Sequence, residues 1–423
     1  MQSLFSKFKL ALKDRSLRNR ILFVVGALAV FRLMATIPIP GVDKIALEQF
    51  FASNQFLGLL NIFSGGGLSN LSIVMLGVGP YITASIIMQL LTMMFPKLKE
   101  MYHEEGEAGR KKFAQYSRLL MVPLSIIQGF SFIVILQRQG IIVDLPILNL
   151  AANIAVIAAG SIMLTWIGEL MSEFGIGSGS SLIIFAGIVA GLPQVASQLV
   201  FSFSPEQLPL YLGFLAAALA VIAGVVTVTE AERPVPVTYA KRVRGSKVTG
   251  GISTYLPLRL NQAGVIPIIF ALSILLFPQM IVNFLSNIDN ELISSLSTFV
   301  SALLANQLFY GSMYFILVVL FTYFYTAVTF DPDSISQNLQ KSGAFVPGVR
   351  PGYHTATYIG KIVTRITLVG ALFLGIIAVL PIGMQALTGL TALSIGGTAL
   401  LIAVSVVLDL IRKIEAQVSM REY

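Results

Sequence analysis

Ten apolar segments, each long enough to cross a lipid bilayer as a helix, dominate this sequence. A spanning helix needs about 20 mainly apolar residues, and the predicted spans are residues 19–37, 74–95, 119–137, 149–168, 181–200, 209–229, 262–284, 307–329, 364–383 and 391–411. The chain of 423 residues is 56% hydrophobic and only 11% charged, which is typical of a polytopic membrane protein. We therefore predict an all-α polytopic membrane protein with about ten transmembrane helices.

Lysine and arginine residues concentrate on one side of the predicted membrane. By the positive-inside rule, short connections rich in Lys and Arg lie in the cytoplasm. Of the 28 basic residues, 25 lie at or beyond the ends of the spans on a single side. Lys44 and Arg138 lie on the opposite side, and Arg32 lies within the first span. Both termini are therefore predicted to be cytoplasmic.

Two predicted cytoplasmic loops, residues 230–260 and 330–361, are much longer than a turn between helices requires. In the first, alternating stretches flank Gly245 and Ser246 and predict a two-stranded ribbon. In the second, residues 333–341 predict a helix, and a Gly/Pro-rich loop that carries Arg350 follows. The length of both loops indicates a partner that binds them.

Glycine and proline interrupt the apolar pattern at two related places. Residues 77–82 and 264–269 share the pattern Gly-Val-x-Pro-x-Ile, five predicted helices apart. An odd offset places the copies in opposite orientations, as in inverted repeats whose broken helices meet at a central site. A match this short also fits the general frequency of Gly and Pro in spanning helices. The glycines at 65–67 just before the first copy predict either an ordinary exposed loop or irregular backbone beside a cavity.

Enzyme chemistry has little material in this chain. There is no Cys, the two histidines, His103 and His354, are expected in polar loops, and no Walker A, H-E-x-x-H or G-x-S-x-G pattern occurs. We predict no catalysis, no metal site and no cofactor. An ion-coupled solute carrier is the rival function, but such carriers bury ionisable groups at mid-membrane, and the helix interiors offer only Arg32.

Isoleucines and rare polar residues are the informative side chains of the spans. Ile82 and Ile86, like Ile184 and Ile188, lie one helical turn apart and share a face. Such faces serve ordinary packing, lipid contact or a constriction that stops ions by dewetting. The polar side chains Gln89, Gln128 and Asn261 predict hydrogen bonds between helices. These form either a static clasp or a seam that opens.

The sequence resembles the SecY family of protein-conducting channels over essentially its full length. The resemblance rests on ten motifs in the family's order: FRLMATIPIPG (31–41), NIFSGGGLSNLSI (61–73), GPYITASIIMQLL (79–91), EGEAGRKKFAQYSR (105–118), GIGSGSSLIIFAGIVAGLP (175–193), VPVTYAKR (235–242), LPLRLNQAGVIPIIFA (256–271), FDPDSISQNLQKSGAFVPGVRPG (330–352), TRITLVGA (364–371) and GGTALLI (396–402). It implies a channel that passes unfolded preproteins across the membrane and releases transmembrane segments sideways into lipid.

The resemblance also implies an architecture. Helices one to five (residues 1–200) and six to ten (residues 201–423, with both long loops) would form two inverted halves around an hourglass pore. The pore ring would comprise Ile82, Ile86, Ile184, Ile188, Ile269 and Ile402. Residues 61–72 would form a plug beneath that ring, with Ser64, Gly65, Gly66, Gly67, Leu68, Ser69 and Asn70 at its centre. Glycine would give the plug a hinge and close packing, and Ser and Asn would tolerate water.

The remaining implications concern the gate, the partners and the location. Gln89, Gln128 and Asn261 would lie on a lateral gate between helices two/three and seven/eight. Lys241, Arg242, Arg244 and Lys247 would dock ribosomal RNA phosphates or an acidic surface of the SecA motor, unless they serve only to set topology. Arg350 would couple the motor. Other expected partners are the SecE and SecG subunits, the ribosome, preproteins with signal sequences, and lipids of the bacterial cytoplasmic (inner) membrane.

Overall fold

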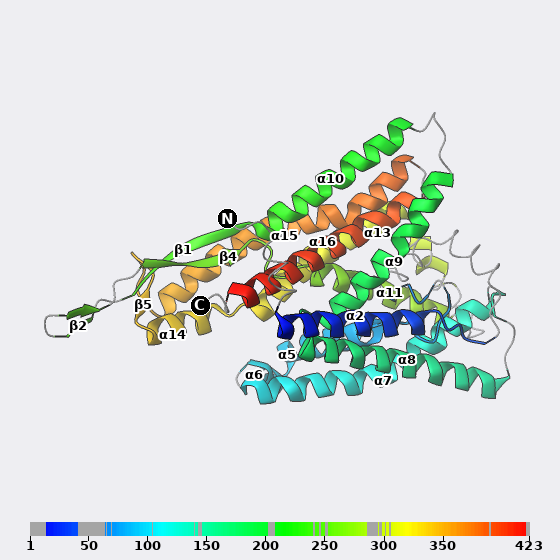
Figure 1. Ribbon diagram of the computed structural model, residues 1–423, viewed down its shortest axis with the longest axis horizontal. Helices are drawn as coiled ribbons and strands as arrows, with labels where there is room; N and C mark the ends of the chain where they lie inside the picture. Colours follow the sequence, from blue (N-terminus) through cyan, green and yellow to red (C-terminus); the bar gives the residue numbers. More distant parts are fainter. Residues whose placement is uncertain are drawn as a thin grey trace.

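The computed structural model describes residues 14–40, 64–388 and 391–419, apart from residues 65, 69, 104, 139, 143–145, 202–207, 240–241, 245–246, 250–252, 286–294, 296–297, 301 and 304–305. Each of the ten predicted spans contains a helix, and these helices form a bundle (Figure 1). They are α2 (Arg15–Ala35), α5 (Gly79–Met94), α7 (Gly106–Arg138), α8 (Ile147–Phe174), α9 (Gly179–Phe201), α10 (Leu208–Glu230), α11 (Ile266–Leu285), α13 (Gln307–Thr329), α15 (Tyr353–Thr388) and α16 (Thr391–Ser419).

Length and apolarity alone qualify fewer helices as membrane spans. Within the described residues, four are long and apolar enough: α7, α8, the α13–α14 segment and α15. The bent pair of α5 and α6 (Pro96–His103) makes a fifth when it counts as one span. The apolar helices Gly179–Pro193, Leu215–Glu230 and Ile266–Leu275 are shorter. In α2, arginines lower the apolarity.

Two helices begin at residues other than those predicted for their spans. The second span was expected from residue 74, but α5 begins at Gly79. Gly77 adopts a φ of +58°, which a helix does not contain, and Pro80 lies in the first turn. Conversely, α15 begins at Tyr353 rather than 364, because its first turns are too polar to count as a span.

A sharp bend separates α5 from α6. The two helices meet at 116°. Phe95 between them is extended (φ −116°, ψ 108°), as expected for the residue before Pro96. α6 then packs against the start of α7. His103 ends α6 and His354 lies in the first turn of α15, so the expectation that both histidines lie in loops was wrong.

The two long loops fold together into one unit, which we call the sheet unit: strands β1 to β5 with α14. Its elements are β1 (Glu232–Tyr239), β2 (Arg242–Arg244), β3 (Lys247–Thr249), β4 (Ser253–Arg259), α14 (Pro332–Lys341) and β5 (Ala344–Phe345). β1 pairs antiparallel with β4, with Val235 opposite Leu256. β2 pairs with β3, so the predicted ribbon is confirmed. The unit extends from one end of the bundle, with β2 at its far tip (Figure 1).

Strand β5 joins the second loop to the first. Thr238 of β1 lies opposite Phe345 of β5, which gives a three-stranded sheet in the order β4-β1-β5. The predicted helix is confirmed as α14, and Asp331 caps it by accepting hydrogen bonds from the amides of Asp333 and Ser334 at 3.0 and 3.3 Å. Val235 and Val237 pack against α15 at Ile359 and Ile362, so the sheet unit has its own apolar core.

Two larger apolar clusters lie in the helical bundle. The first, which we call the central cluster, draws residues from both ends of the sequence, from Val24 in α2 to Val406 in α16. The second, which we call the plug cluster because it contains Leu68 and Leu71 of the predicted plug, joins these residues, Ile39 and Met75 to α7 and α8. A contact between α8 and the chain before α5 needs a small residue: the Gly160 backbone packs on the carbonyl group of Ile73, leaving no room for a Cβ.

Candidate functional site

The six isoleucines of the predicted pore ring lie together in the central cluster. They come from four helices that are far apart in the sequence: Ile82 and Ile86 from α5, Ile184 and Ile188 from α9, Ile269 from α11 and Ile402 from α16. Each side chain is no more than 9% exposed. Lipid contact at the surface of the bundle is therefore excluded for all six. The arrangement gives an aliphatic junction between helices of both halves of the chain.

Helical periodicity alone does not single these residues out. Leu182 and Ile183 in α9 are as buried as Ile184, and Ile268 in α11 is more buried than Ile269. Both helices are covered by neighbours on more than one face. A shared helical face therefore fits ordinary packing in the central cluster as well as a place in the pore ring. Their role in a pore ring stays a prediction.

The predicted plug is partly described. Gly65, Ser69 and residues 61–63 lie outside the described residues. Leu68 and Leu71 are buried in the plug cluster, packed with Phe132 and Ile133 of α7. This part of the segment therefore packs away from the isoleucines. Gly66 is the position that approaches the central region: a Cβ on it would lie 3.9 Å from the carbonyl oxygen of Gly187, next to Ile188.

Serines brace the plug turn from inside. The Leu68 amide donates a hydrogen bond to Ser64 Oγ at 3.0 Å, and Ser72 Oγ donates to the carbonyl oxygen of Gly67 at 2.9 Å. Both serines are almost fully buried. The expectation that serine tolerates water concerns a plug that has swung out, so it stays a prediction; in the present conformation Ser64 and Ser72 serve as internal hydrogen-bond partners. A Cβ on Gly67 would lie 2.9 Å from the carbonyl oxygen of Val74, so glycine permits close packing, as expected.

The last residues of the predicted plug are fastened to the chain that follows α2. The Ile39 amide donates to the Leu71 carbonyl oxygen at 2.9 Å, and the Ile73 amide donates to the Ile37 carbonyl oxygen at 3.0 Å. These two bonds form a short antiparallel bridge around Pro38 and Ser72. The C-terminal end of the predicted plug is thereby held in place beside α2.

The predicted gate residues do not make the hydrogen bonds between helices that the sequence suggested. Gln89 Nε2 lies 3.5 Å from Ser85 Oγ on the same helix, and Asn261 Nδ2 donates to the carbonyl oxygen of Gly264 at 3.1 Å within its own turn. Gln89 Oε1 and Asn261 Oδ1 are buried without a partner. Gln128 is half-buried on α7. The hydrogen bonds of Gln89 and Asn261 therefore do not form a static clasp between helices.

The helices that carry these residues do meet. α11 packs against both α5 and α7, and α13 packs against α11. The contact between α11 and α13 is aromatic: the ring centroids of Phe270 and Phe321 lie 5.9 Å apart, edge to face. The structure thus brings the expected gate helices into one seam. Gln89 on α5 and Asn261 shortly before α11 each keep a buried side-chain oxygen without a partner.

The basic residues of the first loop lie on the outer ribbon. Arg244 pairs with Lys247 across the β2–β3 turn, and Arg242 pairs with Thr249. Lys241 lies outside the described residues. The ribbon is the part of the described chain farthest from the helices (Figure 1). Its position suits contact with a partner outside the membrane.

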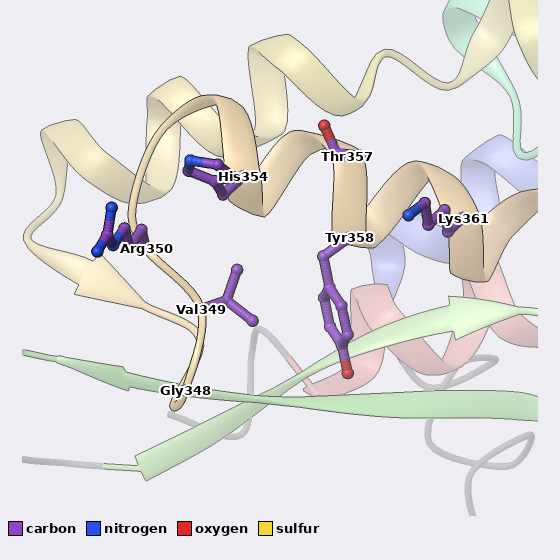
Figure 2. Close-up of a pocket in the computed structure, with 7 residues that line it drawn as sticks. All are labelled: Gly348, Val349, Arg350, His354, Thr357, Tyr358 and Lys361. Atoms are coloured by element: carbon purple, nitrogen blue, oxygen red, sulfur yellow. The ribbon is translucent and has the colours of Figure 1, made fainter.

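Arg350 lines a pocket of about 430 Å³ beside the start of α15. The pocket is lined by Gly348, Val349, Arg350, His354, Thr357, Tyr358 and Lys361. Figure 2 shows the loop that carries Arg350 running past the first turns of α15, while Tyr358 points toward the strands. Arg350 and Lys361 supply positive charge, and Tyr358 supplies a hydroxyl group. The pocket therefore suits an anionic group of a partner.

Two hydrogen bonds hold this loop in place. Ser336 Oγ of α14 donates to the carbonyl oxygen of Gly352 at 2.7 Å, and Thr355 Oγ1 donates to the carbonyl oxygen of Arg350 at 2.8 Å. Gly348 and Gly352 adopt φ values of +82° and +92°, which permit the sharp loop. Sequence reasoning found Arg350 but missed His354, Tyr358 and Lys361, because their proximity depends on how the loop folds over the helix.

Comparison with known proteins gives a consistent family. The family model described as SecY matches residues 72–411. The protein translocase subunit SecY of Mycobacterium tuberculosis (strain H37Rv) is 40% identical over 440 residues, covering 99% of each chain. The subunit of the same name from Thermus thermophilus is 42% identical and covers 98% of this chain and 95% of its own.

Solved structures share the fold at lower identity. A protein-conducting channel superposes with a TM-score of 0.65 at 19% identity, covering 94% of this chain and 92% of that one. Sec61 in a canine ribosome–channel complex from the endoplasmic reticulum gives a TM-score of 0.61 at 18% identity, with the same coverage. The fold is therefore that of a polytopic membrane channel. Because the family model spans most of the chain and full-length relatives are about 40% identical, the chain belongs to the SecY family.

Proposed function

We propose that this chain forms the protein-conducting channel of a bacterial translocase, which passes unfolded preproteins across the membrane and releases transmembrane segments sideways into lipid. The observation that carries the proposal is the burial of six isoleucines from four helices in one central cluster. With the relatives named as translocase subunits, this junction is the natural place for a constriction that a polypeptide threads.

The isoleucines suit a pore that must pass many sequences and leak few ions. Aliphatic side chains make no specific hydrogen bonds, so they can close around any side chain of a passing polypeptide. An apolar constriction also excludes ions by dewetting. The seal matters because moving one charge through 100 mV is worth about 2.3 kcal/mol. Ile82, Ile86, Ile184, Ile188, Ile269 and Ile402 are thus the proposed pore ring, and residues 61–72 are the proposed plug.

The seam between α5/α7 and α11/α13 is the proposed lateral gate, with Gln89, Gln128 and Asn261 at or near it. Leu, Ile, Phe or Val gains about 0.3–0.6 kcal/mol on entering the membrane, whereas a central Asp, Lys or Arg costs about 2.5–3.5 kcal/mol. A gate that opens toward lipid lets each segment of the passing chain partition by this difference. The buried, unpartnered oxygens of Gln89 and Asn261 support a seam that exchanges contacts.

The sheet unit is the proposed docking site for the energy source, the SecA motor or the ribosome. Lys241, Arg242, Arg244 and Lys247 on the outer ribbon and Arg350 in the pocket would bind ribosomal RNA phosphates or acidic side chains. Support comes from the position of the ribbon and from the anionic preference of the pocket. SecE and SecG are the proposed companion subunits, preproteins with signal sequences are the substrates, and no catalytic step is proposed for this chain.

The proposed location is the bacterial cytoplasmic membrane, with the sheet unit and both termini in the cytoplasm. The proposed halves are residues 1–200 and 201–423. The distribution of Lys and Arg supports this orientation, because 25 of the 28 fall, by sequence, in the termini and loops predicted to lie on one side of the membrane, the side that includes both long loops. A cysteine at residue 13 or 420 would test it: both should react with a membrane-impermeant maleimide only in inside-out vesicles.

Crosslinking tests the channel itself. The chain contains no cysteine, so Ile86→Cys provides a single thiol at the proposed ring. A preprotein stalled by a folded C-terminal domain and carrying one cysteine should form a disulfide with residue 86. Trp166→Cys is the control, because the Trp166 side chain is 58% exposed on the outside of α8. Crosslinks at neither position, or equal crosslinks at both, would contradict a central pore and leave a solute carrier as the better function.

A further inference from the structure

Arg32 is the charged side chain that the proposed function leaves without a role. It lies near the end of α2 and is partly buried. A charged residue within a spanning helix is costly, so it is usually kept for a function and has a definable partner. The other arginines of α2 lie at its beginning, at positions 15, 18 and 20, where the helix leaves the predicted membrane.

The first partner of Arg32 is the backbone of α9. Arg32 Nη2 donates a hydrogen bond to the carbonyl oxygen of Ala186 at 2.8 Å and lies 3.4 Å from that of Gly187. These carbonyl groups immediately precede Ile188, a member of the proposed pore ring. A hydrogen bond from a charged donor is stronger than one between neutral groups. Arg32 therefore fixes α9 against α2 at the level of the ring.

The second neighbour is the plug. A Cβ built on Gly66 would lie 3.3 Å from Arg32 Nη1 and 3.9 Å from the carbonyl oxygen of Gly187. Gly66 also has a φ of +82°, a conformation that other residues rarely adopt. The guanidinium group thus lies between α9 and the plug backbone, and a Cβ at position 66 would press on it.

A further contact places the plug against the same end of α2. Asn70 Nδ2 donates to the carbonyl oxygen of Ala35 at 3.4 Å, one helical turn beyond Arg32. Phe31, next to Arg32, is completely buried in the central cluster. The end of α2 is therefore a platform on which the plug rests, and Arg32 is its charged part.

We propose that Arg32 is a positioning residue that latches the plug in the closed channel. Its guanidinium group connects Gly66 of the plug to the α9 backbone beside Ile188, so plug position and ring geometry are held by one side chain. Opening then requires the plug to leave this contact, while Arg32 keeps its bond to Ala186. This proposal rests on the proposed channel function.

The test compares Arg32→Gln with Arg118→Gln in the complete translocase. Arg118 makes an ion pair of 2.7 Å with Glu169 between α7 and α8, so its loss also removes a charged link between helices but leaves the plug untouched. We expect Arg32→Gln to raise the ion leak of resting proteoliposomes about tenfold, because the contact of the guanidinium group with the plug is made only while the plug is seated and a contact to a charged group is worth about this factor, and to permit export of a preprotein with a defective signal sequence. Arg118→Gln should do neither. Equal effects of the two variants would reduce Arg32 to an ordinary helix clip and overturn the proposal.

Gly66→Ala gives a second, independent measurement. The added methyl group meets the guanidinium, so the variant should also leak and also accept defective signal sequences. A single contact can be lost only once, so if both residues act through it the double variant should leak about as much as the worse single variant. The strain from the positive φ at residue 66 is the same with or without the Arg32→Gln change, so it cancels when the four proteins are compared. If the increase in leak of the double variant equals the product of the two single increases, the two residues act independently and the latch is contradicted. If Arg32→Gln fails to accumulate, Gly66→Ala alone still tests the latch, because an unchanged leak in that variant would contradict it.

Crosslinking separates this proposal from the proposed function. Each variant also carries Ile86→Cys and is tested with the stalled preprotein. A preprotein trapped at residue 86, together with unchanged leak and unchanged signal selectivity, would overturn the latch alone. Absence of the trapped product in the otherwise unchanged chain would instead overturn the channel.

Discussion

Ile82 and Ile269 occupy equivalent positions in two copies of the same local structure. The Ile82 amide donates to the Val78 carbonyl oxygen at 3.0 Å, and the Ile269 amide donates to the Val265 carbonyl oxygen at 3.3 Å. Five residues before each isoleucine is a glycine of positive φ, +58° at Gly77 and +62° at Gly264. The helices begin two residues after these glycines, at Gly79 and Ile266, each with proline at its second position. The short sequence repeat is therefore a repeat of backbone structure, which supports the proposed inverted halves.

Gly264→Ala should lower the free energy of unfolding by about 1–2 kcal/mol, because a residue with a Cβ is strained at positive φ. No atom lies within 4 Å of a Cβ built at Gly264, so backbone strain is the whole expected effect. Gly264→Asn should cost less, since Asn tolerates this conformation. Thermal unfolding in detergent measures both. An Asn variant less stable than the Ala variant would contradict the explanation.

Ile188→Ser should increase the resting ion leak while export of an ordinary preprotein continues, because a polar group wets the apolar constriction. Ile359→Ser is the matched control: Ile359 is fully buried, but it belongs to the apolar core of the sheet unit. Both variants should lose comparable stability, about 2–5 kcal/mol by analogy with other large-to-small core substitutions. Conductance across planar bilayers distinguishes them, and equal leaks would remove Ile188 from the proposed ring.

Asn261→Leu should shift the balance between closed and open gate and relax signal-sequence selectivity. The change removes a buried oxygen without a partner and the hydrogen bond to Gly264, two effects of about 1–3 kcal/mol each with opposite sign. Asn153→Leu is the control, because Asn153 also has a buried unpartnered atom but lies on α8, which is not one of the proposed gate helices. Export of preproteins with defective signal sequences is the measurement. Unchanged selectivity in Asn261→Leu would count against its place in the gate.

Arg350→Glu should weaken binding of the SecA motor and of ribosomes about tenfold at low salt, and less at high salt, because charge contacts are screened. Lys341→Glu makes the same charge reversal at an exposed position at the end of α14, outside the pocket. Binding to reconstituted channels at two ionic strengths measures both. If the two variants bind equally well, general surface charge rather than the pocket determines docking.

Tyr314→Phe should raise the free energy of unfolding by about 1 kcal/mol. The Tyr314 side chain is 1% exposed and its hydroxyl group has no hydrogen-bond partner. Removing this hydroxyl group from water therefore destabilises the fold without a compensating hydrogen bond. Tyr323→Phe on the same helix is the control, because its hydroxyl donates to the Thr364 carbonyl oxygen at 3.4 Å near the surface. Thermal unfolding of the two variants should move in opposite directions or leave Tyr323→Phe unchanged. A loss of stability in Tyr314→Phe would show that its hydroxyl is satisfied.

Local patterns in the sequence determined the elements of this protein. Runs of apolar residues located the helices of the ten predicted spans, alternating residues around Gly245 and Ser246 predicted the ribbon, and residues 333–341 predicted the helix α14. These features depend on interactions between residues that are close in the sequence, so a short stretch of sequence is enough to predict them. Motif order then predicted the family, which the comparisons confirmed.

Only the tertiary structure decided which of these elements meet. Isoleucines separated by hundreds of residues converge in one cluster, Arg32 bonds to a carbonyl group 154 positions away, and β5 joins two loops into one sheet. Gln89 and Asn261, expected to bond between helices, instead bond within their own segments. Periodicity gives the face of a helix but not its neighbour, because the neighbour is chosen by the packing of all the helices at once.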